Sequence, residues 1–369
     1  MQKHLRYSVL LLTLALWTPL LLTWLKPIEF IPLNGAFPPV SYEKHPNLWN
    51  AGYQKNIDKY LEENVYGKSV LTKLRNQIQF KLFGKINAKD IYAFDGIFYR
   101  FYSPVFNEEG NFIGKQKVDL IADSLAQLQQ QIGANIPILH VFGPEKSHYF
   151  TKELPSRFKT KSDSTNLKQF KKVFQQKGFH VLDFDAYFRS KKFDYPIFGK
   201  AGIHWTNYAS AHAFDSIIAY LNQLKQTSFD RIEIEKGAST PLDPLDQDLG
   251  YLCNFIQIPS DPALFAYRLK PKRNTGKKVK ALIIADSYFH TCAWTPLKPM
   301  LFDEKSNFEY YFNTRYSGVN QGVKTDVHKI AQEMPDYDCI IYLHGVINLE
   351  NYGFRSISKL IKATAPSQK

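Results

Sequence analysis

One serine follows a strongly apolar run in the last third of the chain. Residues 279–285 predict a buried strand, and Asp286 and Ser287 come directly after it. A serine at the carboxyl end of a buried strand, where a helix begins, can act as a nucleophile beside helix-terminal N–H groups. The alternative is an ordinary helix N-cap, which both Asp and Ser favour. Ser287 is therefore our candidate nucleophile.

A histidine that could serve such a serine lies about 80 residues earlier, in the sequence Gly202-Ile203-His204-Trp205 ahead of a predicted helix. Histidine is the usual general base for a serine, and a neighbouring tryptophan can wall an apolar pocket. We therefore take His204 as the candidate base and Trp205 as a candidate substrate-binding residue. The alternative for His204 is a partly buried histidine with a purely structural hydrogen bond.

Two further strand ends carry polar groups. Gly345 and Asn348 follow the apolar run 338–343, where a glycine N–H and an asparagine amide could stabilise an oxyanion. His344, in the same segment, is an alternative base. Lys146 follows a second apolar run, 136–142, and is a candidate substrate-binding residue. Glycine and asparagine turns after strands are common, and a charged surface loop is the alternative for Lys146.

Helical and strand patterns alternate through the region that holds these residues. We predict a long helical segment over 50–83, a hairpin around Asp95-Gly96, helices over 121–132, 169–176 and 209–221, and strands over 136–142, 180–184, 279–285 and 338–343. This alternation indicates a three-layer α/β/α sandwich with a mostly parallel sheet. Chemistry in such folds lies beyond the carboxyl ends of the strands. Residues 225–275 fit the pattern poorly and are predicted to be a loop-rich insertion.

The composition limits the class of partner. The chain has 369 residues, 44% of them hydrophobic, which is enough to bury a full core and excludes a disordered or collagen-like protein. Its 47 Lys and Arg against 34 Asp and Glu favour an anionic partner. No nucleic-acid-binding motif accompanies this charge, so we expect no nucleic acid. Seven of the cations fall within one short run: Arg268, Lys270, Lys272, Arg273, Lys277, Lys278 and Lys280.

The N-terminus predicts a membrane anchor. Lys3 and Arg6 precede an uncharged stretch over 7–25, which is long enough for a tilted helix across a bilayer. We therefore expect residues 1–27 to form a cytoplasmic tip and a signal anchor, 28–49 an extended tether, and 50–369 the main domain. Basic residues before the anchor predict a single-pass inner-membrane protein with its main domain in the periplasm or outside the cell.

Taken in order, these motifs resemble the AlgJ/AlgX-type SGNH hydrolase-like proteins, a family of membrane-anchored polysaccharide O-acetylation proteins. The resemblance covers roughly residues 50–350. It includes the segment 56–67, the hairpin around Asp95-Gly96, Pro144-Glu145-Lys146, Leu154-Pro155, His204-Trp205 and Asp286-Ser287. Histidine before serine is the circularly permuted motif order of that group.

The resemblance implies an extracytoplasmic O-acetyltransferase without metal or cofactor. Ser287 would take an acetyl group supplied by a membrane-bound O-acyltransferase and pass it to a polysaccharide hydroxyl, with His204 as base and Asn348 at the oxyanion. An anionic polysaccharide would suit the basic charge.

The sequence departs from the family where the triad acid is expected. The acid of the family lies two residues before the histidine, and this chain has Gly202 there. Asp194 is the nearest upstream carboxylate and our candidate acid, with Asp183 and Asp185 further away. A backbone carbonyl that orients His204 in a dyad is another solution. The sequence also leaves open a carbohydrate acetyl-esterase and a non-catalytic, membrane-tethered glycan-binding or assembly protein.

Overall fold

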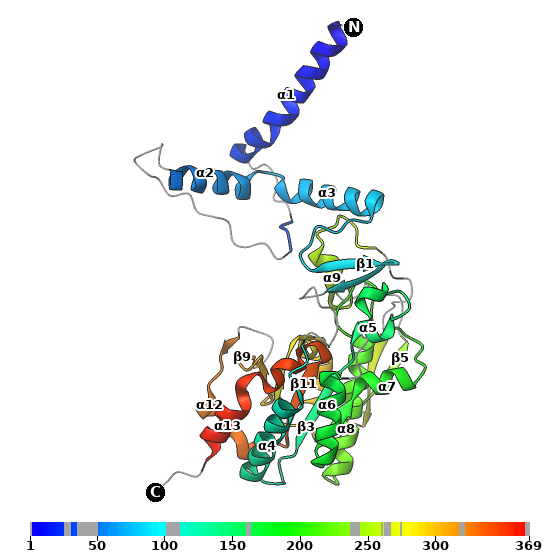
Figure 1. The fold of residues 1–369 in the computed structure, drawn as a ribbon, viewed down its shortest axis with the longest axis vertical. Helices are drawn as coiled ribbons and strands as arrows, with labels where there is room; N and C mark the ends of the chain where they lie inside the picture. The colour runs from blue at the N-terminus through cyan, green and yellow to red at the C-terminus, as the bar shows by residue number, and fades with distance from the viewer. Residues whose placement is uncertain are drawn as a thin grey trace. The chain divides into compact units, whose positions relative to one another are not determined.

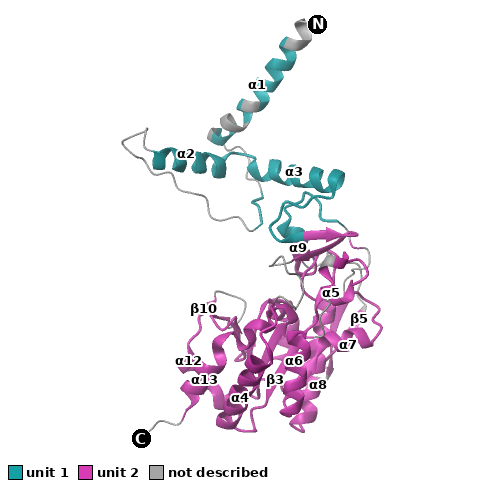
Figure 2. Cartoon of the chain, viewed as in Figure 1, with its two compact units in different colours: residues 1–91, 250–259 teal, residues 92–249, 260–369 magenta. Residues whose placement is uncertain are grey.

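The structure is a computed structural model that describes residues 2–25, 31–34, 51–100, 111–159, 164–236, 244–259, 261, 267–273, 275–316 and 322–365. The predicted tether over 28–49 lies outside these residues except for 31–34. The chain forms two compact units (Figure 2). The first contains residues 1–91 and 250–259, and the second contains residues 92–249 and 260–369.

The first unit is helical. It contains α1 (Gln2–Leu25), α2 (Ala51–Asn64) and α3 (Lys68–Phe83). The helix predicted over 50–83 is thus two helices, because Gly67 adopts a left-handed conformation (φ 77°) that interrupts the run and that glycine adopts without strain. Among the described residues, no helix is both long enough and apolar enough to cross a membrane, so the structure does not show the predicted anchor.

The second unit is built on a seven-stranded sheet in the order β10-β9-β8-β7-β11-β3-β4. Five neighbouring strands are parallel, and β9 and β10 add to one edge in antiparallel pairing. This confirms the mostly parallel sheet. The bounds, in sheet order, are Val323–Lys324, Thr314–Tyr316, Asn307–Tyr310, Ala281–Ala285, Cys339–Gly345, Ile138–Gly143 and His180–Asp183.

Helices cover both faces of this sheet (Figure 1). Along β11, Ile340 and Tyr342 belong to one apolar cluster, while Ile341 and Leu343 belong to the other, as the alternation of a strand requires. The first face is covered by α4 (Lys115–Ile132), α6 (Asn166–Gln176), α12 (Val327–Glu333) and α13 (Ser356–Thr364). The second is covered by α7 (Phe184–Ser190), α8 (Asn207–Leu224), α10 (His290–Ala293) and α11 (Leu297–Leu301).

Two smaller sheets complete the strands. The predicted hairpin is present as β1 (Ile91–Phe94) and β2 (Ile97–Arg100), and both turn residues, Asp95 (φ 48°) and Gly96 (φ 73°), have the positive φ that a tight hairpin needs. The region predicted to be loop-rich contains an antiparallel pair, β5 (Arg231–Lys236) and β6 (Tyr267–Arg273). It also contains a 3-10 turn, η2 (Pro244–Gln247), and the short helix α9 (Asp248–Leu252).

Part of the basic run is neutralised by its own neighbours. In the β5–β6 pair, Lys270 lies opposite Glu233 and Arg268 lies opposite Glu235, and Lys270 Nζ forms a 2.6 Å ion pair with Glu235. Lys280 pairs with Asp336 at 3.1 Å. The run is therefore a weaker attractor of anions than its seven charges suggest.

Candidate active site

Ser287 lies where the sequence predicts it, one residue past Asp286 at the carboxyl end of β7. It begins a short 3-10 helix, η3 (Ser287–Phe289), and it is half-buried. The N-cap of this helix is Asp286, whose Oδ1 accepts a hydrogen bond from the Tyr288 N–H at 3.0 Å. Because Asp286 does the capping, the Ser287 hydroxyl is available for a different partner. That partner is His204, with 2.7 Å between Ser287 Oγ and His204 Nε2.

A closed loop holds His204 in place. Phe198 and Trp205 form an antiparallel bridge, and the Thr206 N–H donates to the Ile197 carbonyl at 2.8 Å. Thr206 then caps α8, because its hydroxyl accepts a hydrogen bond from the Ala209 N–H at 3.2 Å. His204 is thereby fixed between a bridge and a helix start, and its imidazole keeps 13% of its surface exposed.

The acid that completes the triad is Asp248, and the prediction of Asp194 was wrong. His204 Nδ1 lies 2.6 Å from Asp248 Oδ2. The other carboxylate oxygen, Oδ1, accepts hydrogen bonds from the Ile203 N–H at 2.8 Å and the Leu249 N–H at 2.9 Å, so the carboxylate is held on both sides. Asp194 is an exposed residue upstream of the loop. Ser287, His204 and Asp248 therefore form a hydrogen-bonded nucleophile–base–acid chain.

The two more distant carboxylates serve other structures. Asp183 caps α7 by accepting a hydrogen bond from the Ala186 N–H at 3.0 Å. Asp185 is buried and pairs with His148 at 3.1 Å and with Arg189 at 2.6 Å. Neither orients His204, and a dyad oriented by a backbone carbonyl is excluded by the Asp248 hydrogen bond.

Gly202 allows the acid to come from a different segment. A Cβ atom at Gly202 would lie 2.6 Å from the backbone oxygen of Asp246, closer than real Cβ atoms approach. The segment that delivers Asp248 therefore occupies the space that a side chain at position 202 would need. Asp246 fixes this segment by accepting a hydrogen bond from the Asn207 N–H at 2.8 Å. The same packing therefore excludes a side chain at position 202 and places the carboxylate of Asp248 beside His204.

With this geometry established, comparison with known proteins identifies the domain. A family model described as the SGNH hydrolase-like domain of the acetyltransferase AlgX matches residues 102–282. This region belongs to the AlgX-type SGNH hydrolase-like family. The match confirms the resemblance predicted from the motifs, and it includes His204 and Asp248 but ends before Ser287. No curated protein matches the chain.

Solved structures give distant likenesses. The O-acetyltransferase domain of Pseudomonas putida AlgJ is 15% identical, with 74% of this chain and 99% of that chain covered and a TM-score of 0.46. Bacillus cereus PatB1 is 12% identical over 72% of this chain and 98% of that chain, with a TM-score of 0.43. Pseudomonas aeruginosa AlgX is 14% identical over 77% of this chain and 70% of that chain, with a TM-score of 0.45. These sequence identities and TM-scores are too low to assign a function to this chain.

Asn348 is linked through Asp286 to the segment that carries Ser287. Asn348 Nδ2 and the Gly345 N–H both donate to Asp286 Oδ2, each at 2.7 Å. Burial raises the pKa of the Asp286 carboxyl, and these hydrogen bonds oppose that shift. The Gly345 N–H, a predicted oxyanion donor, is thus directed to Asp286. The Asn348 amide has a second N–H, so it keeps a donor for an oxyanion.

Lys146 holds the histidine loop, and the prediction that it binds substrate was wrong. It is 3% exposed, and its Nζ donates to the carbonyls of Gly199, Lys200 and Gly202 at 2.8, 2.8 and 2.6 Å. All three donors of the ammonium are therefore used on the loop that leads to His204. Burial lowers the pKa of Lys146 to about 7, against the opposing influence of Asp248.

Trp205 was also predicted to contact substrate, and it is fully buried instead. Its Nε1 donates to the Tyr288 carbonyl at 3.1 Å and to the Thr291 hydroxyl at 2.8 Å. Trp205, which directly follows His204, is therefore hydrogen-bonded to η3 and α10, the two short helices that follow β7. These hydrogen bonds tie the histidine loop to the segment that begins at Ser287.

Tyr288 packs against the base of the triad. Its hydroxyl donates to the Pro144 carbonyl at 2.6 Å, and its ring meets the His204 ring edge-on at 5.3 Å. Gly143 and Gly345, which are register partners on β3 and β11, leave room for this ring, because a Cβ on either would lie 2.8 or 2.5 Å from it. These glycines serve packing against Tyr288.

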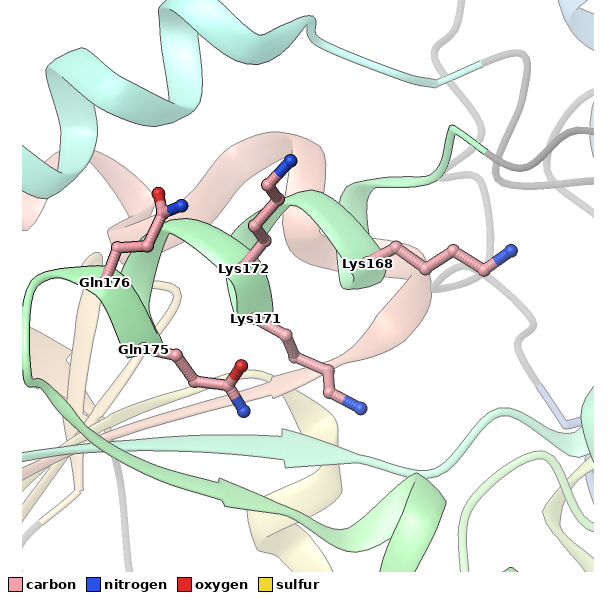
Figure 3. A pocket seen from close by; sticks show the side chains of 5 residues that line it. All are labelled: Lys168, Lys171, Lys172, Gln175 and Gln176. Carbon is pink, nitrogen blue, oxygen red and sulfur yellow. The ribbon is translucent and has the colours of Figure 1, made fainter.

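The alternative base His344 is excluded by burial. It is completely buried, and its Nε2 accepts a hydrogen bond from the Gly353 N–H at 2.9 Å. Burial lowers its pKa to about 3. A shallow, open depression on the surface of α6 is lined by Lys168, Lys171, Lys172, Gln175 and Gln176, and by no triad residue (Figure 3).

Proposed function

We propose that this chain is an extracytoplasmic O-acetyltransferase that moves an acetyl group through a serine acyl-enzyme onto hydroxyls of an exported or cell-surface polysaccharide. The observation that carries the proposal is the continuous chain from Ser287 Oγ through His204 to Asp248, with contacts of 2.7 and 2.6 Å. A domain of the AlgX-type acetyltransferase family around it supports the acyl group and the glycan acceptor.

The reaction consists of two steps, acetylation of Ser287 and transfer of the acetyl group to a sugar hydroxyl. In the first, Ser287 Oγ attacks the acetyl carbonyl of the donor, His204 Nε2 accepts the serine proton, and the same proton goes to the departing donor oxygen. In the second, a sugar hydroxyl attacks the acetyl-serine, its proton passes to His204, and Ser287 Oγ leaves and recovers the proton. Asp248 accepts a hydrogen bond from Nδ1 throughout, which keeps Nε2 free to accept a proton and stabilises the imidazolium.

The charge that develops on the carbonyl oxygen needs donors. The second N–H of Asn348 and the backbone N–H of Ser287 are the donors that we propose, because the Tyr288 and Gly345 N–H groups donate to Asp286. In serine enzymes, one such side-chain donor contributes about 10²–10³ in rate.

We propose a membrane-bound O-acyltransferase as the acetyl donor and a polysaccharide as the acceptor. The net charge of +13 favours an anionic glycan. The lysines on α6 add to this charge, although Lys171 pairs with Asp183. We also propose an extracytoplasmic location, because the sequence predicts an anchor and the enzyme must meet an exported polymer. A reporter that is active only outside the cytoplasm, fused to the C-terminus, tests this location.

The rival readings differ in what happens to the acetyl group. An esterase passes it to water through the same triad, and a glycan-binding protein does not react with it. A serine and histidine within hydrogen-bond distance are an unnecessary arrangement for a binding protein, which favours an enzyme.

The test uses the full-length chain with p-nitrophenyl acetate, with and without acetyl-free oligosaccharides. Release of nitrophenol and mass-spectrometric detection of acetylated sugar measure the two halves separately. We expect Ser287→Ala to lose at least about 10⁴-fold in nitrophenol release. Ser190→Ala should keep it, because Ser190 is a surface serine whose hydroxyl donates to the Tyr187 carbonyl. Release without sugar acetylation favours the esterase, and equal activity in Ser287→Ala removes this serine from the mechanism.

A further inference from the structure

Helix α3 in the first unit exposes a continuous apolar stripe. Leu71, Leu74, Ile78 and Leu82 are 54%, 43%, 46% and 70% exposed. Their spacing of three and four residues places them along one face of the helix. Single exposed leucines are ordinary on protein surfaces, but a contiguous stripe marks a surface that contacts something apolar.

The opposite face of α3 already has its partners. Asn76 is buried and its Nδ2 donates to the Cys253 carbonyl at 3.0 Å, and the Phe80 ring lies 4.9 Å from the Phe255 ring. Residues 76 and 80 point away from the stripe on a helix with 3.6 residues per turn. The packing of this helix within the described part of its unit therefore does not use the leucines.

The charges of α3 have one sign. The helix carries Lys68, Lys73, Arg75 and Lys81 and no acidic residue. Lys68 pairs with Glu63 outside the helix at 2.8 Å. Arg75 and Lys81 are both exposed and lie on the two flanks of the stripe, where their long side chains can extend past the leucines to a surrounding polar layer.

We propose that α3 binds in the plane of an anionic lipid surface, with Leu71, Leu74, Ile78 and Leu82 inserted between the acyl chains and Arg75 and Lys81 at the lipid phosphates. An apolar stripe flanked by cations, on a helix without acidic residues, is a feature of interfacial membrane helices. At the end of α3, outside the stripe, Phe83 is also exposed. Charge complementarity selects lipid as the occupant, because an anionic bilayer offers apolar depth and a layer of negative charge in one surface. The inference does not rest on the triad or on the acetyl-transfer proposal.

The test measures the depth of the helix itself. In the described structure all three cysteines, Cys253, Cys292 and Cys339, are buried, and burial raises the pKa of each thiol. A nitrobenzoxadiazole label therefore selects an introduced surface cysteine. We would label Ile78→Cys in the stripe and, as control, Lys329→Cys at an exposed position of α12 in the whole chain. Quenching by dithionite is then followed with phosphatidylglycerol vesicles, with phosphatidylcholine vesicles and without vesicles.

We expect the label at position 78 to quench several-fold more slowly with phosphatidylglycerol vesicles than with phosphatidylcholine vesicles, and the label at 329 to quench equally in both. Arg75→Glu with Lys81→Glu should remove the protection at 78. Because the readout is local, attachment of another segment to the vesicle does not produce it. Equal quenching at 78 in all three conditions overturns the proposal, as does equal protection by both lipids. Protection without vesicles also overturns it, because the stripe is then covered by protein.

Discussion

Replacement of Asp248 by Asn isolates the acid of the triad. In the wild-type chain, Asp248 Oδ2 accepts the Nδ1–H of His204 at 2.6 Å, while Oδ1 accepts the N–H groups of Ile203 and Leu249. Asparagine keeps one oxygen for those two backbone donors and changes only the group that faces His204. The loop is therefore retained, and the chemistry of one contact changes.

The expected loss of activity is large because the asparagine amide reverses the tautomer of His204. An NH₂ group facing Nδ1 donates instead of accepting, so Nδ1 must lose its proton and Nε2 must carry it. An Nε2–H cannot accept the proton of Ser287. In serine enzymes this wrong tautomer costs about 10⁴ in rate, which corresponds to about 5 kcal/mol in the activation free energy.

The assay is kcat/KM for p-nitrophenyl acetate, with circular dichroism and thermal unfolding to show that the variant folds. Asp194→Asn is the matched control, since Asp194 is exposed and the structure assigns His204 to Asp248. It should retain wild-type activity. An Asp248→Asn variant within tenfold of wild type, or a loss in Asp194→Asn instead, would refute the assignment of the acid.

Two further substitutions test the support of the site, and a change of pH tests the buried histidines. Lys146→Met leaves three loop carbonyls without their cation. The value of kcat should therefore fall roughly 10²-fold because His204 is displaced, and Lys146→Arg is measured alongside. An unchanged kcat in Lys146→Met would contradict this role of Lys146. Gly202→Asp should lower activity, because the restored family carboxylate meets the backbone oxygen 2.6 Å from its Cβ; a gain in kcat/KM would disprove that packing argument. Burial lowers the pKa of His140 and of His344 to about 3. Below the unfolded value near 6.5 the unfolded chain binds protons that the folded chain does not, so stability falls as pH drops from about 6.5 toward 3. The free energy of unfolding measured with urea should be lower at pH 5 than at pH 7 by about 2 kcal/mol per histidine. The control His328→Gln should show the same loss. Equal urea midpoints at the two pH values would count against this prediction.

Local patterns were sufficient for the elements that alternate regularly. The strands at 138–143, 281–285 and 339–345 are predominantly apolar runs, and their parallel order follows from the helices between them. The strands at 307–310, 314–316 and 323–324 were missed because they are short, include polar residues and lie toward the edge of the sheet.

The sequence by itself determined the candidate nucleophile Ser287 and the candidate base His204, which the structure places 2.7 Å apart, because each lies at a strand end or helix start that its neighbours specify. Asp286 and Ser287 follow the apolar run that forms β7, and His204 precedes a capped helix. Only the tertiary structure decided the acid. Asp248 lies 44 residues after His204, in a segment without periodicity, and it reaches Nδ1 because Gly202 leaves space for the backbone at Asp246. Tertiary packing likewise decided that Lys146 and Trp205 support the loop from inside, since a motif specifies which side chain is present but not whether folding turns it toward substrate or core.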